Sequence, residues 1–161
     1  MLDDESRTAR PGPACTLAAA AVLSLTAGCA AQAPGCDQGQ VNRRLVSDFV
    51  HRFYDQRDVR GAFERYVAPD YVQHNPNIAD GREAAIVALT PLFANREVQL
   101  QVRHVIVDGD MVVVHLLARE NPAARGAAVA DIFRISGGRI VEHWDILEDI
   151  PEHSLNPHPM F

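Results

Sequence analysis

Two ionisable side chains interrupt apolar segments near the C-terminal end of the sequence. Asp131 lies within AAVADIFRIS, and His143 lies within RIVEHWDIL. Core-facing strand positions normally carry Val, Ile or Phe, so a carboxylate or an imidazole there needs a structural hydrogen bond or a chemical task. A carboxylate in apolar surroundings can accept a proton from a carbon beside a carbonyl group, and a nearby imidazole can stabilise the enolate. We predict that Asp131 is an acid/base assisted by His143, with a purely structural role as the alternative for each.

Four further residues are candidate ligand contacts. Tyr71 and His74 lie in the short extended segment YVQHNPN, His115 interrupts a Val-rich strand, and Phe133 follows Asp131 by two positions. Alternation places Phe133 on the same strand face as Asp131. For His74 the alternative is a turn-stabilising role, and for His115 it is a hydrogen-bonded core position.

The neighbours of His143 are expected to lie elsewhere. Trp144 alternates to the opposite strand face, where we expect it to pack between sheet and helices. Glu142 and Asp145 are expected to face solvent or to pair with arginine. Neither acid is predicted to belong to the site.

The composition excludes several kinds of chemistry. All fifteen basic residues are arginine, so no lysine is present to form a Schiff base or to bind phosphate in a P-loop. The net charge of −6 argues against nucleic acid as a partner. Four histidines and Asp131 offer metal-binding groups, but no two histidines have close ligand spacing, and no Gly-rich nucleotide loop appears. We therefore expect neither a metal nor a cofactor.

The first half of the domain is expected to be helical. Apolar residues recur at helical spacing after Asp37, a capping residue, and continue to about Tyr54. A short helix is predicted over Val59 to Tyr66. A third helix is expected to begin after a capping Asp80, and Pro91 should kink it or end it early.

From Glu97 onward the apolar period changes to two. Strands are predicted from there to Val107, over Met111–Arg119, over Ala127–Ile135 and over Arg139–Glu148. Their short connections predict that sequence neighbours pair. The fold class is therefore α+β, with three N-terminal helices on a strongly curved four-stranded antiparallel sheet that leaves an apolar cavity.

The N-terminus has the features of an export signal. Two arginines precede the apolar run ACTLAAAAVLSLTA, which is too short to span a bilayer as a mature helix. The run ends in small residues before Cys29, a pattern similar to a bacterial lipobox. We expect residues 1–28 to be a signal peptide, Cys29 to be lipidated and residues 29–36 to be a tether. An ordinary secretory signal without lipidation is the alternative.

Residues 37–161 resemble the SnoaL-like branch of the NTF2-like superfamily. The resemblance rests on an ordered set of short motifs: Tyr71–Pro76, Gly81–Glu83, His115, Asp131–Arg134, Glu142–Asp145, Asn156 and Met160–Phe161. It implies an NTF2-like cone with a ligand cavity. The family includes polyketide cyclases that use an aspartate on a late strand as acid/base, and Asp131 is at the matching position. Ketosteroid isomerase and several dehydratases share the wider fold, as do many non-catalytic domains.

We expect an exported domain that catalyses proton transfer on a carbonyl compound without a cofactor. The reaction would be of the aldol, isomerase or lyase type. The alternative is a non-catalytic lipoprotein that binds a small hydrophobic ligand. A third possibility is a homodimer that forms through the sheet and acts as an interaction domain. We expect the domain to contact the membrane only through a lipid on Cys29. The expected location is the outer face of the cytoplasmic membrane or the periplasm.

Overall fold

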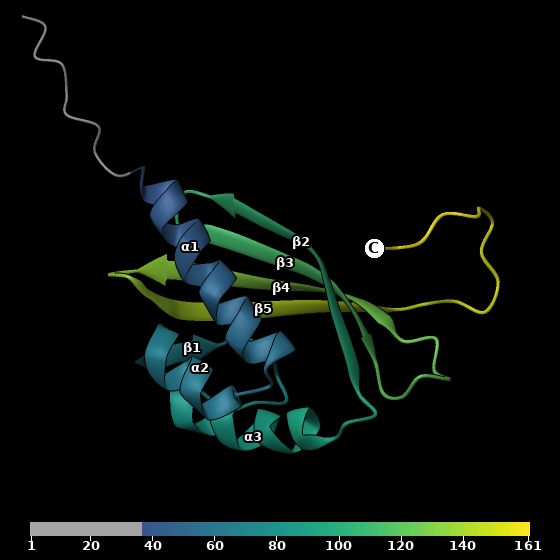
Figure 1. Ribbon diagram of the computed structural model, residues 1–161, viewed down its shortest axis with the longest axis horizontal. Coiled ribbons are helices and arrows are strands. Elements are labelled where there is room, and N and C mark those ends of the chain that lie inside the picture. The colour runs from purple at the N-terminus through teal and green to yellow at the C-terminus, as the bar shows by residue number, and fades with distance from the viewer. Residues whose placement is uncertain (1–36) are drawn as a thin grey trace, which may run out of the picture. The chain divides into compact units, whose positions relative to one another are not determined.

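The computed structural model describes residues 37–161, which form three α-helices, one π-helical turn and five β-strands. The predicted signal peptide, the tether and Cys29 lie outside the described residues. Within residues 37–161, no helix is both long enough and apolar enough to cross a membrane. Figure 1 shows the helices gathered on one side of the sheet, as the predicted α+β class requires.

The first helix continues into a π-helical turn. α1 spans Gln38–Val50, and its cap is Asp37, whose Oδ1 accepts a hydrogen bond of 3.1 Å from the Gly39 amide. The π-helical turn η1 spans His51–Asp55. The wider π turn places two consecutive side chains, Phe53 and Tyr54, in the interior, each 5% exposed.

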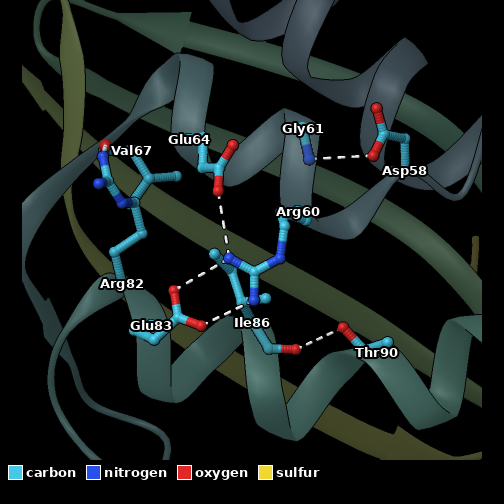
Figure 2. A network of polar contacts seen from close by, with 9 residues as sticks. All are labelled: Asp58, Arg60, Gly61, Glu64, Val67, Arg82, Glu83, Ile86 and Thr90. Carbon is cyan, nitrogen blue, oxygen red and sulfur yellow. Dashed lines mark hydrogen bonds and ion pairs between the residues drawn. The ribbon is translucent and has the colours of Figure 1, made fainter.

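The second and third helices are joined by an ion-pair network. α2 spans Val59–Tyr66, as predicted, and α3 spans Arg82–Ala94. Figure 2 shows Arg60 of α2 between Glu64 and Glu83, with N–O distances of 3.1 and 2.7 Å. All three side chains are more than half exposed, so the pairs add little stability and chiefly link the two helices.

The expected cap of α3 is wrong, and so is the expectation that Pro91 ends the helix early; the alternative, a kink at Pro91, stays a prediction. The residue that caps α3 is Gly81, at φ 96°, while the Asp80 carboxylate accepts a 2.8 Å hydrogen bond from the Gln73 amide. The helix also passes Pro91 and ends at Ala94. Only three residues follow Pro91, so its missing N–H removes one hydrogen bond near the helix end and leaves most of the helix intact.

The sheet has five strands, not the four predicted. The strands are β1 (Val67–Gln73), β2 (Gln99–Asp108), β3 (Met111–Arg119), β4 (Ala127–Ser136) and β5 (Arg139–Asp149). Their order is β1-β5-β4-β3-β2, with β1 parallel to β5 and every other pair antiparallel. The strand missed by the prediction, β1, contains Pro69, which an edge strand with an irregular register tolerates.

The core lies between the helices and one face of the sheet. On β4 the alternate residues Ala127, Val129, Phe133 and Ile135 are buried, which places Asp131 on that same face. Phe49 of α1 is fully buried and packs edge-on against Phe133 with ring centroids 5.6 Å apart. The face that carries Asp131 is therefore the covered one.

Candidate active site

Asp131 and His143 meet on the covered face of the sheet. The antiparallel register pairs Phe133 with His143 and Asp131 with Asp145, so Asp131 and His143 are diagonal neighbours on β4 and β5. The His143 Nε2 atom lies 3.3 Å from Asp131 Oδ1, and the two side chains are 11% and 13% exposed. The proximity of the two side chains follows from the period-two alternation of both strands.

The second oxygen of Asp131 accepts a hydrogen bond from the Tyr54 hydroxyl. Tyr54 comes from the π-helical turn η1. Burial, reinforced by the Asp131 charge, raises the pKa of Tyr54 well above its ordinary value. The phenol therefore keeps its proton at neutral pH and is a hydrogen-bond donor, and both carboxylate oxygens of Asp131 have a partner.

A second carboxylate lies directly opposite the first. Asp145 is the register partner of Asp131 and lines the same cavity. Its Oδ2 atom accepts a 2.6 Å hydrogen bond from the Asn75 side-chain amide. The expectation that Asp145 faces solvent or pairs with arginine is wrong, because alternation places it on the same face as His143.

The other ring nitrogen of His143 contacts the buried amide of Gln73. The His143 Nδ1 atom lies 2.9 Å from Gln73 Oε1, and Gln73 Nε2 donates a 3.0 Å hydrogen bond to the Tyr71 hydroxyl. Tyr71 is 3% exposed, and burial, followed by the nearby Asp131 charge, raises its pKa well above the ordinary value. Tyr71 therefore keeps its proton, and its oxygen already accepts one hydrogen bond.

These polar groups line one part of a cavity of about 380 Å³. Most of the wall is apolar and comes from the helices and the inner sheet face: Phe49, Phe53, Phe63, Ile78, Ala88, Leu89, Leu92, Phe93, Leu100, Leu116, Ala118, Val129, Phe133 and Leu147. The other lining residues are polar: Tyr54, Tyr71, Gln73, Asn75, Asn77, Asp131, His143 and Asp145. A large apolar wall with a few convergent polar groups is typical of a small-molecule site.

Two of the four candidate ligand contacts line this cavity, namely Tyr71 and Phe133. The other two do not. His74 stacks on Trp144 with ring centroids 4.5 Å apart, and its Nε2 lies 3.5 Å from a Glu142 oxygen. His115 alternates with the buried Val114 and Leu116, so it lies on the opposite sheet face, where its Nδ1 is 3.3 Å from that of His104.

The predicted packing of Trp144 is also wrong. It lies on the sheet face opposite His143, as alternation requires, but the helices cover the His143 face. Trp144 instead contacts His74 and the guanidinium of Arg134, which is 5.7 Å from a ring centroid. The expected pairing of Glu142 with Arg134 is present, with an N–O distance of 2.6 Å.

Three side chains at the site offer ligand atoms that could hold a metal ion. One atom each from Asp131, His143 and Asp145 lies within 4.8 Å of the others. Oxygen and imidazole ligands suit several divalent cations. His143 and Asp145 form a His-x-Asp pattern on one strand. The spacing between histidines does not reveal this pattern.

Four residues of the site were not identified from the sequence: Tyr54, Gln73, Asn75 and Asp145. Tyr54 falls on the apolar side of the predicted first helix, although a buried phenol needs a hydrogen-bond partner. Asp145 shares the alternation of His143. Gln73 and Asn75 flank His74 in the YVQHNPN segment, where polar side chains of this kind commonly bond to nearby backbone.

Comparisons with solved structures place this arrangement in a known fold. A candidate SnoaL-like polyketide cyclase from Jannaschia sp. CCS1 is 18% identical, with a TM-score of 0.56 over 72% of this chain and 91% of that chain. A candidate ketosteroid isomerase from Kribbella flavida DSM 17836 is 14% identical, with a TM-score of 0.59 over 74% and 86%. TsrD from Streptomyces laurentii is 24% identical, with a TM-score of 0.53 over 68% and 89%. These similarities show the NTF2-like fold.

A comparison with curated proteins found no match. The family model described as SnoaL-like domain matches residues 46–143, which include the end of α1, the other two α-helices, β1 and most of the sheet up to His143. This span contains Tyr54, Gln73, Asp131 and His143. Because the match covers more than half of the 161 residues, the chain belongs to the SnoaL-like domain family.

Proposed function

We propose that this domain catalyses cofactor-independent proton transfer on a carbonyl compound, with Asp131 as the acid/base. The observation that supports it best is the contact between Asp131 and His143 at the wall of the apolar cavity. A carboxylate held by an imidazole and a phenol in a mostly apolar cavity is a general-base arrangement. The fold, shared with proteins described as cyclases and isomerases, is compatible with this chemistry.

The proposed reaction moves one proton and one electron pair. Asp131 takes the proton from the carbon next to the carbonyl, and the C–H electron pair moves into the enolate. Tyr71 donates its hydroxyl hydrogen bond to the enolate oxygen, since the Tyr54 hydroxyl is already directed at Asp131. The protonated Asp131 then returns the proton to carbon or to a departing oxygen. In this reaction Tyr71 stabilises the enolate oxygen, a role that the sequence suggested for His143.

The lining of the cavity favours an uncharged ligand. The ionisable residues of the wall are two aspartates, two tyrosines and one histidine, and no arginine is among them. A ligand carboxylate would face two aspartates with no arginine among the lining residues to pair with it, which costs free energy in a mostly apolar site. The proposed substrate class is therefore neutral, hydrophobic carbonyl compounds.

Hydrogen–deuterium exchange tests the proposal. The protein is incubated in D₂O with 2-tetralone, a neutral bicyclic ketone, and the loss of the signals of the protons next to the carbonyl is followed by ¹H NMR. The proposal predicts exchange well above the rate in buffer alone. A panel of neutral cyclic and aryl ketones that bind, by ligand-observed NMR, without accelerated exchange would contradict it.

The second candidate function is the non-catalytic binding of a small hydrophobic ligand. The aromatic and aliphatic wall of the cavity favours this function. The hydrogen-bond partners of both Asp131 oxygens, Tyr54 and His143, also favour it. Native mass spectrometry of the purified protein distinguishes the two functions when combined with the exchange assay. A ligand that is retained through purification and does not exchange its protons supports this candidate.

Export and lipidation at Cys29 remain part of the proposal. They are supported by the apolar run over residues 14–27 and the small residues before Cys29. In a bacterial host, the full chain should fractionate with membranes, and Cys29→Ser should release it or leave it uncleaved. Equal distribution of both proteins would contradict lipidation.

A homodimer through the sheet is also proposed. The register aligns Ile106, Val113, Ile132 and Trp144 in one row across the outer face of four strands. Ile106 is 57% exposed, and Ile146 on the same face is 63% exposed. Such an apolar band is suited to association. Light scattering should give twice the monomer mass, and Ile106→Glu should reduce it to that of a monomer.

A further inference from the structure

Gln73 is a buried amide at the end of β1, where the parallel register pairs it with His143. Its side-chain oxygen is within 2.9 Å of two nitrogens, the Asn75 backbone amide and His143 Nδ1. Its side-chain nitrogen donates to the Tyr71 hydroxyl. Every polar atom of this side chain therefore has a partner, as a buried amide requires.

The contact with Asn75 fixes which way the Gln73 amide points. A backbone N–H can only donate, so the atom that it meets must be the oxygen of the amide. The same oxygen meets His143 Nδ1, and an amide oxygen can only accept. Nδ1 must therefore carry a proton, which determines the tautomer of His143.

This tautomer has a consequence on the other side of the ring. In a neutral imidazole protonated at Nδ1, the lone pair of Nε2 would point at Asp131 Oδ1, 3.3 Å away, with no proton between them. The contact becomes favourable when one proton lies between the two atoms, as imidazolium with carboxylate or as imidazole with carboxylic acid. The second oxygen of Asp131 is occupied by Tyr54, which donates.

We propose that Gln73 is a positioning residue that fixes the Nδ1–H tautomer of His143, so that His143 Nε2 and Asp131 Oδ1 share one transferable proton. When that proton is on Nε2, Asp131 is an ionised carboxylate that can act as the base. When the substrate proton moves to Asp131, its electron pair remains on the substrate as the enolate. The tautomer itself does not depend on the proposed function; only the use of the shared proton does.

The side-chain amide of Asn75 is oriented in the same way. Its side-chain oxygen accepts a 2.8 Å hydrogen bond from the Asn77 backbone amide, so its NH₂ group is the part that contacts Asp145. The segment from Gln73 to Asn77 thus uses two backbone N–H groups to orient two side-chain amides. One of these amides sets the proton position on His143, and the other stabilises Asp145 as a carboxylate.

Histidine ¹⁵N NMR tests the assignment on the intact domain. The His143 signals are identified by their loss in His143→Asn. We expect Nδ1 of the wild-type protein to be protonated at every pH at which the protein is folded. Gln73→Glu, which keeps an acceptor oxygen in the same place, should preserve this state. Gln73→Leu, which removes the acceptor, should move the ring proton to Nε2 and reduce ketone proton exchange about 100-fold or more.

The wild-type spectrum decides the question even if Gln73→Leu does not fold. A non-protonated Nδ1 in the wild-type protein would overturn the proposal, and so would an Nδ1–H tautomer that persists in a folded Gln73→Leu variant. If the tautomer is as expected but the protein exchanges no ketone protons, the proposed function fails and the role of Gln73 stands.

Discussion

Asp131 and Asp145 are direct partners in the antiparallel register of β4 and β5, so two carboxylates face each other at the cavity wall. Like charges in directly opposed strand positions are destabilising. The two acids are held by different partners, His143 and Tyr54 for Asp131 and Asn75 for Asp145. This separation of partners leaves Asp131 as the carboxylate that is coupled to an imidazole.

Removing the second charge should stabilise the protein. Asp145→Asn keeps an oxygen for the Asn75 amide and removes the repulsion, so we expect the free energy of unfolding in urea to rise by about 0.5 kcal/mol. Glu148→Gln, at an exposed charged position of the same strand, is the control for a new amide on β5. A loss of more than about 1 kcal/mol would indicate that the Asp145 charge has a favourable partner such as a cation.

The two buried tyrosines should resist ionisation. The pKa values of Tyr54 and Tyr71 are raised in the fold, mainly by burial, whereas an unfolded tyrosine ionises near about 10. The stability that they contribute is therefore complete below that pH and decreases as the pH rises above it. Phenolate absorbance of these two residues should appear only with unfolding.

Asp131→Asn tests what raises the pKa values of Tyr54 and Tyr71. The Asp131 charge contributes to the raised pKa of both tyrosines, after burial. Both should therefore ionise at a lower pH in this variant, as long as it remains folded. In a Tyr66→Phe background, which leaves Tyr54 and Tyr71 as the two tyrosines of the chain, phenolate absorbance near about pH 10 in the folded protein would be inconsistent with the burial described.

The cap of α2 should contribute to stability. Asp58 Oδ1 accepts a 2.9 Å hydrogen bond from the Gly61 amide, which Figure 2 shows, and Oδ2 contacts Arg52. Asp58→Ala should cost about 1 kcal/mol in urea unfolding at pH 7. Asp58→Asn keeps the cap and should cost less.

The stability that the Asp58 cap contributes should decrease in acid. The Gly61 hydrogen bond and then Arg52 lower the pKa of Asp58, so its contribution is present above the unfolded value of about 3.9 and is lost as the pH falls through the folded pKa. The difference between wild type and Asp58→Ala should therefore narrow in acid. A constant difference across that range would show that the charge has no part in the cap.

Ligand charge should decide affinity for the cavity. We expect 2-tetralone to bind at least tenfold more tightly than the matched carboxylate 2-naphthoate at pH 7, because the carboxylate would face Asp131 and Asp145. Asp145→Asn should narrow this ratio. Tighter binding of the carboxylate in isothermal titration would show that the ligand occupies another surface.

Much of the fold follows from local pattern. The boundaries of β3 and α2 could be predicted to the residue, because each pattern is bounded by a turn or a proline. The inner face of β4 could also be predicted, since Asp131 alternates with four apolar residues. β1 could not, because seven residues that contain Pro69 do not read as a strand, and its parallel partner β5 is about seventy positions away.

The site could be predicted only in part for the same reason. Alternation is sufficient to bring His143 to Asp131 once the strands pair. The contribution of Tyr54 depends on a π-helical turn, which shifts its direction relative to α1. The outward position of Trp144 depends on which sheet face the helices cover. That is a property of tertiary packing that strand periodicity does not contain.

In the proposed reaction Asp131 carries the proton in the cavity. The most direct measurement compares wild type, Asp131→Asn and Asp145→Asn for deuterium exchange into 2-tetralone at a saturating ketone concentration, with binding measured in parallel. We expect Asp131→Asn to lose exchange by about 10³-fold or more while binding changes little, and Asp145→Asn to retain most of the exchange. Undiminished exchange in a folded Asp131→Asn variant would contradict it.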